Sequence, residues 1–354
     1  MSDVLLLRPG ELGGLVTMGE AIDAVSAAYG GATEYPVINA PRRRVHSPDG
    51  VRISSFPGGV HALGVIGSQT RAELVRQEEG QQHYDYREHP VFVLNDSHTG
   101  RLLAVLFGEV TERDLGPSSL MALRTAATSG VGFRHLVRED ARTAGVFGTG
   151  GQALHQIQAL LCERPSITRI NVFGRDEERR RRFAADVGER FGVEVIPVER
   201  PEAVIKGADA ILCATNTNVT LFDGDLLEPG QHVTGIIGSN MQLVEGGFLK
   251  APRREIDDRT AERADVIVAN LRDSIASERQ GDLWQPIEAG RLSLEDIHDL
   301  GEVVTGQRKG RTSADQITYH KNNNGTGAAD LAVAMLAYRK ALDMGRGTRF
   351  DLGT

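Results

Sequence analysis

A glycine-rich turn stands between two apolar runs in the middle of the chain. The run from Thr143 to Phe147 is followed at once by Gly148, Gly150 and Ala153 in the pattern G-x-G-x-x-A, and a helical repeat and a second apolar run come next. In a strand–turn–helix–strand unit these glycines permit a tight turn and a close approach to a pyrophosphate, which the first N–H groups of the helix then bind. The pattern predicts a dinucleotide site, and a glycine-rich turn without a ligand is the alternative.

Arg124 is the second residue whose type suggests chemistry. It is the only strong charge in the otherwise apolar helical stretch 116–130. A guanidinium in such a helix is costly unless it meets an anion. Two interpretations stay open: a structural ion pair, or a bidentate contact with a substrate carboxylate.

The elements that position these residues follow an alternating rhythm. Strand-like runs at 193–198, 208–215, 232–237 and 264–269 alternate with helical stretches, which is typical of a doubly wound parallel sheet over about residues 130–310. Polar residues such as Thr215 and Asn216 follow a strand, where an open α/β sheet binds its ligands.

The two ends of the chain predict a separate α+β domain. A capping box at Thr17 and Glu20 opens a helix, and strand-like runs at 90–94 and 102–107 flank turn residues and form a predicted hairpin. Near the carboxyl end a short strand at 316–320 precedes KNNNGTG and a helix at 328–342. The asparagine-rich turn is expected to supply hydrogen bonds to a ligand, and an exposed loop is the alternative.

Composition excludes several classes of protein. The chain has 354 residues, a formal net charge of −8 and no long basic stripe, which argues against a nucleic-acid partner. It carries two cysteines, no signal-like start and no apolar run long enough for a bilayer, so we expect a cytoplasmic protein with no membrane contact. No histidine or cysteine spacing suggests a metal site.

Six segments together resemble the ornithine cyclodeaminase/mu-crystallin family over nearly the whole chain. They are RTAATS (124–129), GTGGQA (148–153), IGSN (237–240), RADVIVAN (263–270), GDL (281–283) and GTGAADLAVA (325–334). The resemblance implies a homodimer with a discontinuous substrate-binding and dimerisation domain, residues 1–128 and 312–354, and a dinucleotide-binding domain, residues 129–311. It also implies hydride transfer between a nicotinamide and the carbon–nitrogen bond of an amino acid or imino acid.

The resemblance implies roles for individual residues. Arg124 looks like the arginine that binds the substrate carboxylate, and an upstream arginine corresponds to Arg44 or its neighbour Arg43. The expected cofactor contacts are Thr125, Gly148, Gly150, Gly151, Gln152, Ala153, Arg175, Asp176, Thr215, Asn216, Ser239, Asn324 and Gly325.

Two positions depart from the family pattern. Ile66 stands where cyclodeaminases have a lysine, and Asn240 stands where they have an aspartate. An amide does not relay a proton, so ring closure with loss of ammonia is disfavoured and a one-way imine reductase or amino-acid dehydrogenase is expected. His320 and Lys321 are candidate proton donors by type, with a solvent-facing pair at a strand end as the alternative.

The end of the second strand bears on the choice of cofactor. Gly174 and Arg175 stand where NAD-binding folds usually have an acidic residue, and Arg179 follows one helical turn later, which favours the 2′-phosphate of NADP. NAD remains an alternative, because the carboxylate of Asp176 is close enough in the sequence to bind the ribose.

Two wider alternatives stay open. A non-catalytic NADP-binding protein or a cyclodeaminase has the same outline. The polar segment 69–87 indicates a polar or charged substrate, or else a surface loop.

Overall fold

The structure is a computed structural model that describes residues 3–31, 35, 37–78, 81–109, 119–238, 241–247, 249–322 and 326–353. The chain divides into two compact units, the first made of Met1–Arg124, Gln242–Lys250 and Gly325–Thr354, the second of Thr125–Met241 and Ala251–Asn324. The boundaries expected from the sequence, at 128/129 and 311/312, differ from this division mainly because the strand near residue 318 pairs within the second unit.

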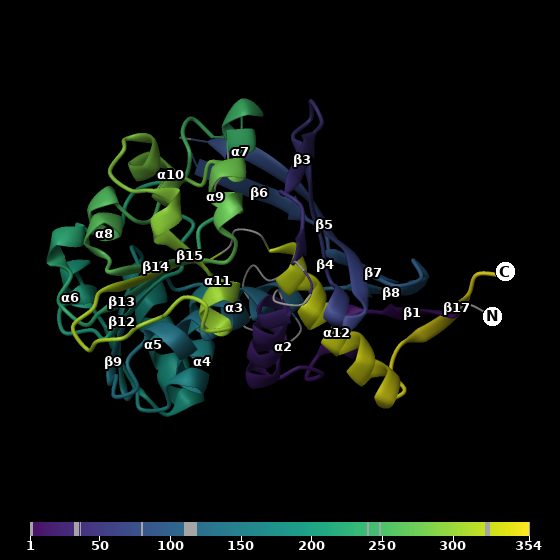
Figure 1. Ribbon diagram of the computed structural model, residues 1–354, viewed down its shortest axis with the longest axis horizontal. Helices are drawn as coiled ribbons and strands as arrows, with labels where there is room; N and C mark the ends of the chain where they lie inside the picture. The colour runs from purple at the N-terminus through teal and green to yellow at the C-terminus, as the bar shows by residue number, and fades with distance from the viewer. Residues whose placement is uncertain are drawn as a thin grey trace. The chain divides into compact units, whose positions relative to one another are not determined.

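The first unit is built on a mixed sheet with the strand order β17-β1-β8-β7-β5-β4-β2, with β3 also on β4 and β6 also on β5 (Figure 1). Its strands are β1 (Asp3–Leu7), β2 (Ile38–Asn39), β3 (Arg43–His46), β4 (Val51–Val60), β5 (Val65–Glu78), β6 (Gln81–Arg87), β7 (Val91–Asp96), β8 (Leu102–Phe107) and β17 (Thr348–Asp351). Its helices are α1 (Pro9–Leu12), α2 (Met18–Gly30), α12 (Gly327–Asp343) and most of α7 (Met241–Glu245).

The predicted hairpin at 90–107 is confirmed as β7 and β8, and the predicted capping box at Thr17 and Glu20 begins α2. The segment 69–87 is not a surface loop, because β5 continues to Glu78 and pairs with β4, β6 and β7. Side chains on a strand alternate between faces, so every second residue of this segment points to the side that α12 covers.

The register of β4 and β5 places polar side chains on the covered face. Arg52 and Ser54 are buried while the intervening Val51 and Ile53 are exposed, and the buried Glu73 lies opposite Arg52. This is the reverse of the usual alternation, in which apolar residues face the core. In this part of the sheet, the face that α12 covers therefore carries polar side chains.

Helix α12 approaches β4 backbone to backbone. A Cβ on Gly58 would lie 2.4 Å from the carbonyl carbon of Gly327, and a Cβ on Gly327 would lie 2.3 Å from the oxygen of Pro57. No side chain larger than hydrogen fits at either position, so the start of α12 has a fixed position on this strand.

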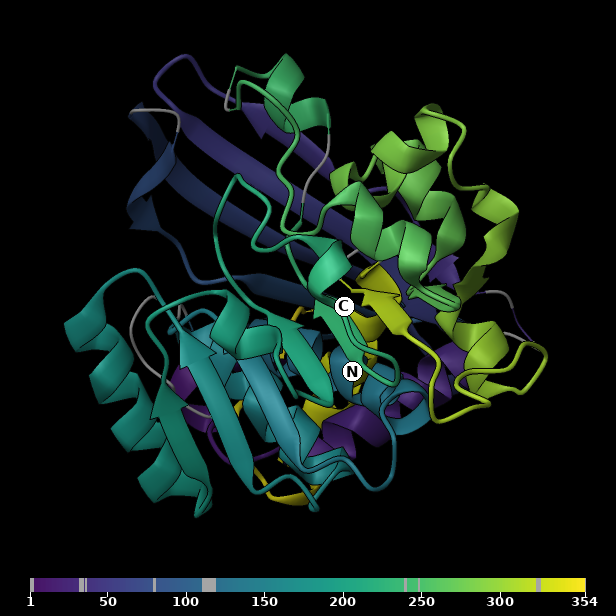
Figure 2. The same ribbon diagram turned by 90° about the vertical axis from the view of Figure 1, so that its left-hand side faces the viewer.

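The second unit is built on a parallel sheet with the order β11-β10-β9-β12-β13-β16-β14-β15 (Figure 2). Its strands are β9 (Thr143–Phe147), β10 (Arg169–Phe173), β11 (Glu194–Pro197), β12 (Ala210–Cys213), β13 (His232–Gly235), β14 (Val266–Ala269), β15 (Ile297–Asp299) and β16 (Thr318–Lys321). Its helices are α4 (Gly151–Glu163), α5 (Glu177–Phe191), α6 (Glu202–Ile205), α8 (Asp258–Arg263), α9 (Arg272–Glu278), α10 (Gly281–Glu288), α11 (Leu300–Val304) and most of α3 (Leu120–Leu136).

Helices cover both faces of this sheet. On one face an apolar cluster joins strand residues such as Ile211 and Val233 to helix residues such as Val204 and Leu283. On the other face the ring of Phe133 in α3 packs edge-on against His232, with 5.8 Å between ring centroids. The predicted fold class, a doubly wound parallel sheet with a second α+β part, is confirmed. Among the described residues no helix has the length and apolar character needed to cross a membrane.

Candidate functional site

The glycine turn follows strand β9 and leads into α4, as the sequence predicts. Gly148 has φ +116°, and a Cβ there would lie 2.2 Å from the carbonyl oxygen of Ala214. Gly150 is the residue before α4, and no side chain caps that end of the helix. The turn thus brings bare backbone and unpaired N–H groups to one place, which fits the diphosphate of a dinucleotide. Gly151, Gln152 and Ala153 form the first turn of this helix.

The end of the second strand, β10, places an arginine over the glycine turn. The Nε of Arg179 donates to the carbonyl of Thr149 at 3.2 Å, and its Nη2 lies 3.7 Å from where a Cβ of Gly150 would be. Asp176 begins α5, and its Oδ1 accepts the N–H of Arg179 at 2.8 Å. Arg175 and Asp176 are both exposed.

A buried carboxylate organises the carboxyl ends of strands β12 and β13. Glu255 is fully buried, and its Oε1 accepts the N–H and the hydroxyl of Thr215 at 2.9 and 3.0 Å. Its Oε2 accepts the N–H groups of Ile236 and Ile237 at 3.1 and 2.8 Å. Burial raises the pKa of the Glu255 carboxyl to about 7, against the opposing charge of Lys321. Glu255 therefore fixes Thr215 and the segment that leads towards residues 239–240.

Lys321 and Asp282 hold the backbone around Glu255 in place. The Nζ of Lys321 lies 2.5 Å from Oδ2 of Asp282 and donates to the carbonyl of Ile237 at 2.9 Å. The Oδ1 of Asp282 accepts the N–H groups of Glu255 and Ile256 at 2.9 and 3.2 Å. Lys321 and Asp282 are both fully buried, so the ion pair is part of the core.

His320 is equally enclosed. It is fully buried, with Nε2 3.0 Å from Oδ1 of Asn270, and a Cβ on Gly132 would lie 2.2 Å from its Nδ1. Burial lowers the pKa of the His320 imidazole to about 3, so the ring is neutral near pH 7. The alternative that His320 and Lys321 face solvent is wrong, because both side chains are buried in the core around the parallel sheet. Their burial also speaks against the proton-donor role that their types suggested.

One asparagine of the KNNNGTG segment is structural. Asn322 is fully buried, and its Nδ2 donates to the carbonyl of Thr125 at 2.7 Å and to the hydroxyl of Ser129 at 2.8 Å. The exposed-loop alternative is therefore wrong for Asn322. Asn324 and Gly325, like Ser239 and Asn240, lie outside the described residues, so their predicted contacts stay predictions.

Arg124 forms a buried ion pair in the first unit. Its Nε lies 2.6 Å from Oδ1 of Asp330 on α12, and its side chain is only 4% exposed. Burial raises the pKa of the Asp330 carboxyl, and the charges of Arg124, Arg42 and Arg71 oppose that rise. The structural ion pair is therefore present, and it holds the guanidinium in one orientation. Arg44 lies opposite Ser54, on the same face of the sheet.

A second group of charges surrounds Glu73 on β5. The Oε2 of Glu73 accepts Nε and Nη2 of Arg52 at 3.2 and 2.6 Å. Arg71 and Arg87 approach the other oxygen, with nitrogen–oxygen distances of 3.1 and 3.6 Å. Three arginines thus share one carboxylate on the covered face.

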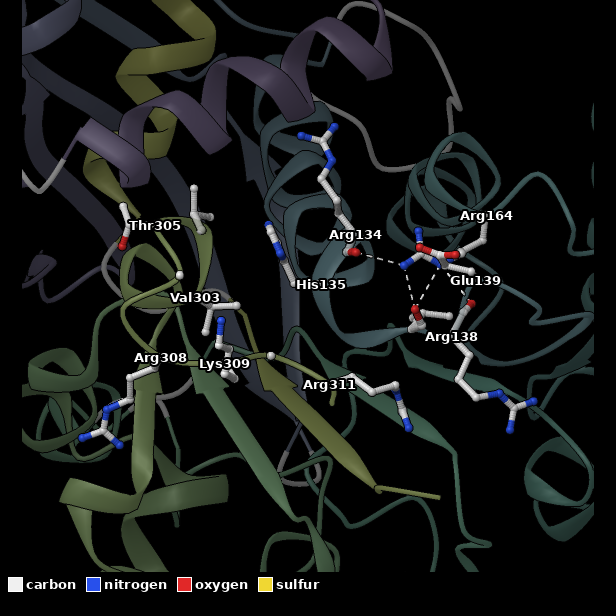
Figure 3. Close-up of a pocket in the computed structure, with 14 residues that line it drawn as sticks. Arg134, His135, Arg138, Glu139, Arg164, Val303, Thr305, Arg308, Lys309 and Arg311 are labelled. Atoms are coloured by element: carbon white, nitrogen blue, oxygen red, sulfur yellow. Dashed lines mark hydrogen bonds between the residues drawn. The ribbon is translucent and has the colours of Figure 1, made fainter. Parts of the chain in front are cut away.

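A cavity of about 510 Å³ in the second unit lies at the other end of the parallel strands from the glycine turn (Figure 3). It is lined by several cationic side chains, of which Arg164 and Arg311 bind backbone carbonyls. Arg164 donates to the carbonyls of Arg134 and Val137 at the end of α3, and Arg311 donates to those of Leu136 and Gln231. This cavity is therefore not the candidate site. No group of side chains in the described part of the chain has the make-up of a metal site.

Sequence reasoning missed Glu255 and gave Asp282 no role. Glu255 lies in the highly charged run 253–258, which looks like a surface segment. Only the hydrogen-bond partners, which come from the ends of β12 and β13 and from the start of α10, distinguish it from its neighbours.

Comparisons with known proteins agree with this architecture. The profile of the ornithine cyclodeaminase/mu-crystallin family matches residues 7–345. A putative dehydrogenase of Rhizobium meliloti is 35% identical over 74% of this chain and 73% of its own. A Delta(1)-pyrroline-2-carboxylate reductase of Bacillus cereus is 30% identical over 74% of each chain. The solved structure of the Thermococcus litoralis Delta(1)-pyrroline-2-carboxylate reductase with NADH and L-proline superposes with a TM-score of 0.81, covering 98% of this chain and 99% of that one at 24% identity.

Proposed function

The chain belongs to the ornithine cyclodeaminase/mu-crystallin family, and we propose that its reaction is the reduction of an α-imino acid to an amino acid. It is a nicotinamide-dependent oxidoreductase that acts at a carbon–nitrogen bond. The observation that carries the proposal is the glycine turn, where Gly148 has a backbone conformation and a close contact that only glycine permits. A dinucleotide held there would supply a hydride to the imine carbon, and the π electrons of the C=N bond would pass to nitrogen.

The residues of the chain have three tasks in this reaction. The turn from Thr149 to Gly151 would hold the diphosphate through its N–H groups. Arg124 binds the substrate carboxylate, helped by Arg44, and Asp330 orients its guanidinium through the Nε edge. Glu255 fixes Thr215 beside the strand ends. Lys321 is a positioning residue in this proposal, because its ammonium is held by Asp282 inside the core.

No protein acid is required for the hydride step when the substrate is an iminium ion. Such an ion arrives with its proton on nitrogen, and hydride addition gives the neutral amine directly. This agrees with the enclosed positions of His320 and Lys321 and with an amide at Asn240, which we propose accepts a hydrogen bond from the iminium N–H.

We favour NADP as the dinucleotide. Arg179 lies over the glycine turn, and Arg175 is exposed two residues after β10, so we infer that both guanidinium groups are available to a 2′-phosphate. Asp176 uses one carboxylate oxygen to begin α5. Arg179→Ala is expected to weaken NADPH binding about 10- to 100-fold and NADH binding much less. Arg181→Ala is the matched control, since Arg181 lies on the same helix but pairs with Glu177 in solvent. Equal losses for both cofactors with Arg179→Ala would refute the assignment.

The test of the reaction is the loss of NADPH absorbance with pyruvate, glyoxylate or a cyclic imino acid in ammonium or methylamine buffer. Turnover that needs both the carbonyl compound and the amine supports an imine reductase. Tight binding of NADPH without turnover of any substrate supports the alternative of a binding protein, and absence of both cofactor binding and turnover would overturn the proposal.

A homodimer is the expected assembly. The outer faces of β3, β4 and β6 expose Val45, Val51, Ile53 and Tyr86, with 39–64% of each residue accessible. Such an apolar sheet face suits a second copy of the chain. Light scattering of the purified protein would test this, and a monomer at micromolar concentration would contradict it.

A further inference from the structure

Three polar side chains lie together on the covered face of β4 and β5. Ser54 is directly opposite Arg71 in the antiparallel ladder, and Gln69 is two residues before Arg71 on the same face. Directly opposed residues have Cβ atoms about 4.5–5.5 Å apart, so one small chemical group is able to contact all three side chains. Ser54 and Gln69 are fully buried.

Gln69 and Ser54 have unmet hydrogen-bonding capacity. Among the described residues, neither the amide oxygen nor the amide nitrogen of Gln69 has a hydrogen-bond partner, and neither does the hydroxyl of Ser54. The residues opposite Gln69 on the neighbouring strands are Phe56 and Phe92, so the apolar surroundings supply none. Buried polar groups in native proteins are nearly always paired, and a ligand or a bound water is one explanation for those that are not.

Arg71 has more donors than acceptors. Its ion-pair partner is Oε1 of Glu73, at 3.1 Å, and Arg87 approaches the same oxygen at 3.6 Å. The hydrogen-bond acceptor that the structure gives Arg71 is the sulfur of Met121, at 3.0 Å. A thioether is a weak acceptor for a guanidinium, which has five N–H donors. Burial lowers the pKa of this guanidinium, as expected of a cation taken from water without a full complement of acceptors.

Arg71 also lies near the predicted binding site for the substrate carboxylate. Its Nη1 lies 3.0 Å from the sulfur of Met121, which precedes Arg124 by three residues on α3 and therefore lies on the same side of that helix. The charge of Arg71 also acts on Asp330, the ion-pair partner of Arg124, as does that of Arg42. A substrate that is held by Arg124 at one end therefore has Arg71 available to its other end.

We propose that Ser54, Gln69 and Arg71 bind a second carboxylate, and that the substrate is an imino dicarboxylic acid. This inference rests on the proposed function and names its substrate class. The three side chains offer O–H and N–H donors and one positive charge, which matches an anion with several acceptor lone pairs. A substrate with a distal ammonium group would instead meet the charge of Arg71, so diamino acids are disfavoured.

The position of Ile66 supports this assignment. Ile66 stands where the family resemblance leads one to expect a lysine, but it is exposed and lies on the opposite face from Gln69 and Arg71. On the covered face β5 presents Gln69, Arg71 and Glu73, and of these only Gln69 and Arg71 offer N–H donors.

The experiment compares imines of two kinds in ammonium buffer. Oxaloacetate and 2-oxoglutarate give imines with two carboxylates, whereas pyruvate and 2-oxobutyrate give imines with one. The wild-type enzyme is expected to show a kcat/KM at least about 10-fold higher for the dicarboxylates. Arg71→Met should lower that value about 10- to 100-fold while changing the monocarboxylates less than about threefold. Arg76→Met is the control, because Arg76 lies on the same strand but faces outward and pairs with Asp85 in solvent.

Gln69→Leu provides a readout that does not depend on the fold tolerating a lost charge. It removes an unpaired amide from an apolar place, so Tm should rise by roughly 2–10 °C while dicarboxylate turnover falls. A fall in Tm with unchanged turnover would contradict the assignment of Gln69. Equal losses for both substrate classes with Arg71→Met, or a wild-type preference for monocarboxylates, would overturn the inference yet leave the imine reductase intact. Failure of the proposed function itself would appear as no turnover of either class.

Discussion

Replacement of Lys321 by methionine tests the buried network behind the strand ends. The Lys321 ammonium lies 2.5 Å from Oδ2 of Asp282, and neither side chain is exposed. Methionine keeps the length of the side chain but leaves the Asp282 carboxylate in the core without its cation. Removal of one partner from a buried ion pair costs about 3–5 kcal/mol, because the remaining charge stays desolvated.

This cost has a measurable size in a thermal scan. In domains of 150–250 residues, 1 kcal/mol shifts Tm by about 2–4 °C, so Lys321→Met is expected to lower Tm by roughly 6–20 °C. Calorimetry of the purified full chain would measure the shift directly, and a bound nicotinamide cofactor should be absent so that its binding does not mask the loss.

Lys340→Met is the matched control for this substitution. Lys340 also meets a carboxylate, Glu20, at 2.6 Å, but the two side chains are 24% and 43% exposed. Partly exposed pairs contribute about 0–1 kcal/mol, so Tm should fall by less than about 4 °C. Equal shifts for the two variants would show that the Lys321 pair is not a buried structural element, and the positioning role proposed for Lys321 would be withdrawn.

Three further outcomes are expected. The pKa of Glu255 in the folded state is about 7, above its ordinary value of 4.5, so the folded state binds a proton more tightly than the unfolded state. The free energy of unfolding should therefore fall as pH rises between these two values, by at most about 1.4 kcal/mol per pH unit. Urea midpoints at pH 5 and 7.5 should show this fall, and Glu255→Gln should abolish it. Gly148→Ala should weaken NADPH binding at least about 10-fold in a fluorescence titration, because its Cβ meets Ala214, whereas Gly192→Ala, also at positive φ but in open space, should not. Arg124→Lys should keep the charge beside Asp330 but lose the planar fork, so kcat/KM should fall about 100-fold with cofactor affinity unchanged; unchanged kinetics would remove Arg124 from the site.

Much of the second unit was predictable because its signals are local. The glycine turn is defined by adjacent residues with special backbone needs, and the alternating apolar runs predict the parallel strands. Strands such as β13 and β14 begin within two residues of their predicted starts. Fold class and family follow from these signals.

The site was less predictable because burial of charge has no local signal. Lys321 and Glu255 look like surface residues in the sequence, and both are fully buried because their partners come from distant segments. His320 shows the same, since its enclosing contacts come from Asn270 and Gly132, which are distant in the sequence.

The first unit shows a second reason, which concerns the pattern of its strands. Apolar and polar residues alternate at the start of β4, but there the polar Arg52 and Ser54 are buried and the apolar Val51 and Ile53 are exposed. A pattern alone assigns the apolar face to the core, so it points to the wrong side of this sheet. The correct side follows only from the position of α12.

The contact between Gly58 and Gly327 makes the position of α12 independent of the side chains around it. The start of α12 rests on β4 through main-chain atoms, so changes at neighbouring side chains leave the height and direction of the helix, and with them Asp330, as they are. Residues such as Gln69 and Arg71 are then free to be exchanged over generations for others that suit a new substrate. Relatives with different substrates are accordingly expected to differ along β5 while keeping this glycine pair.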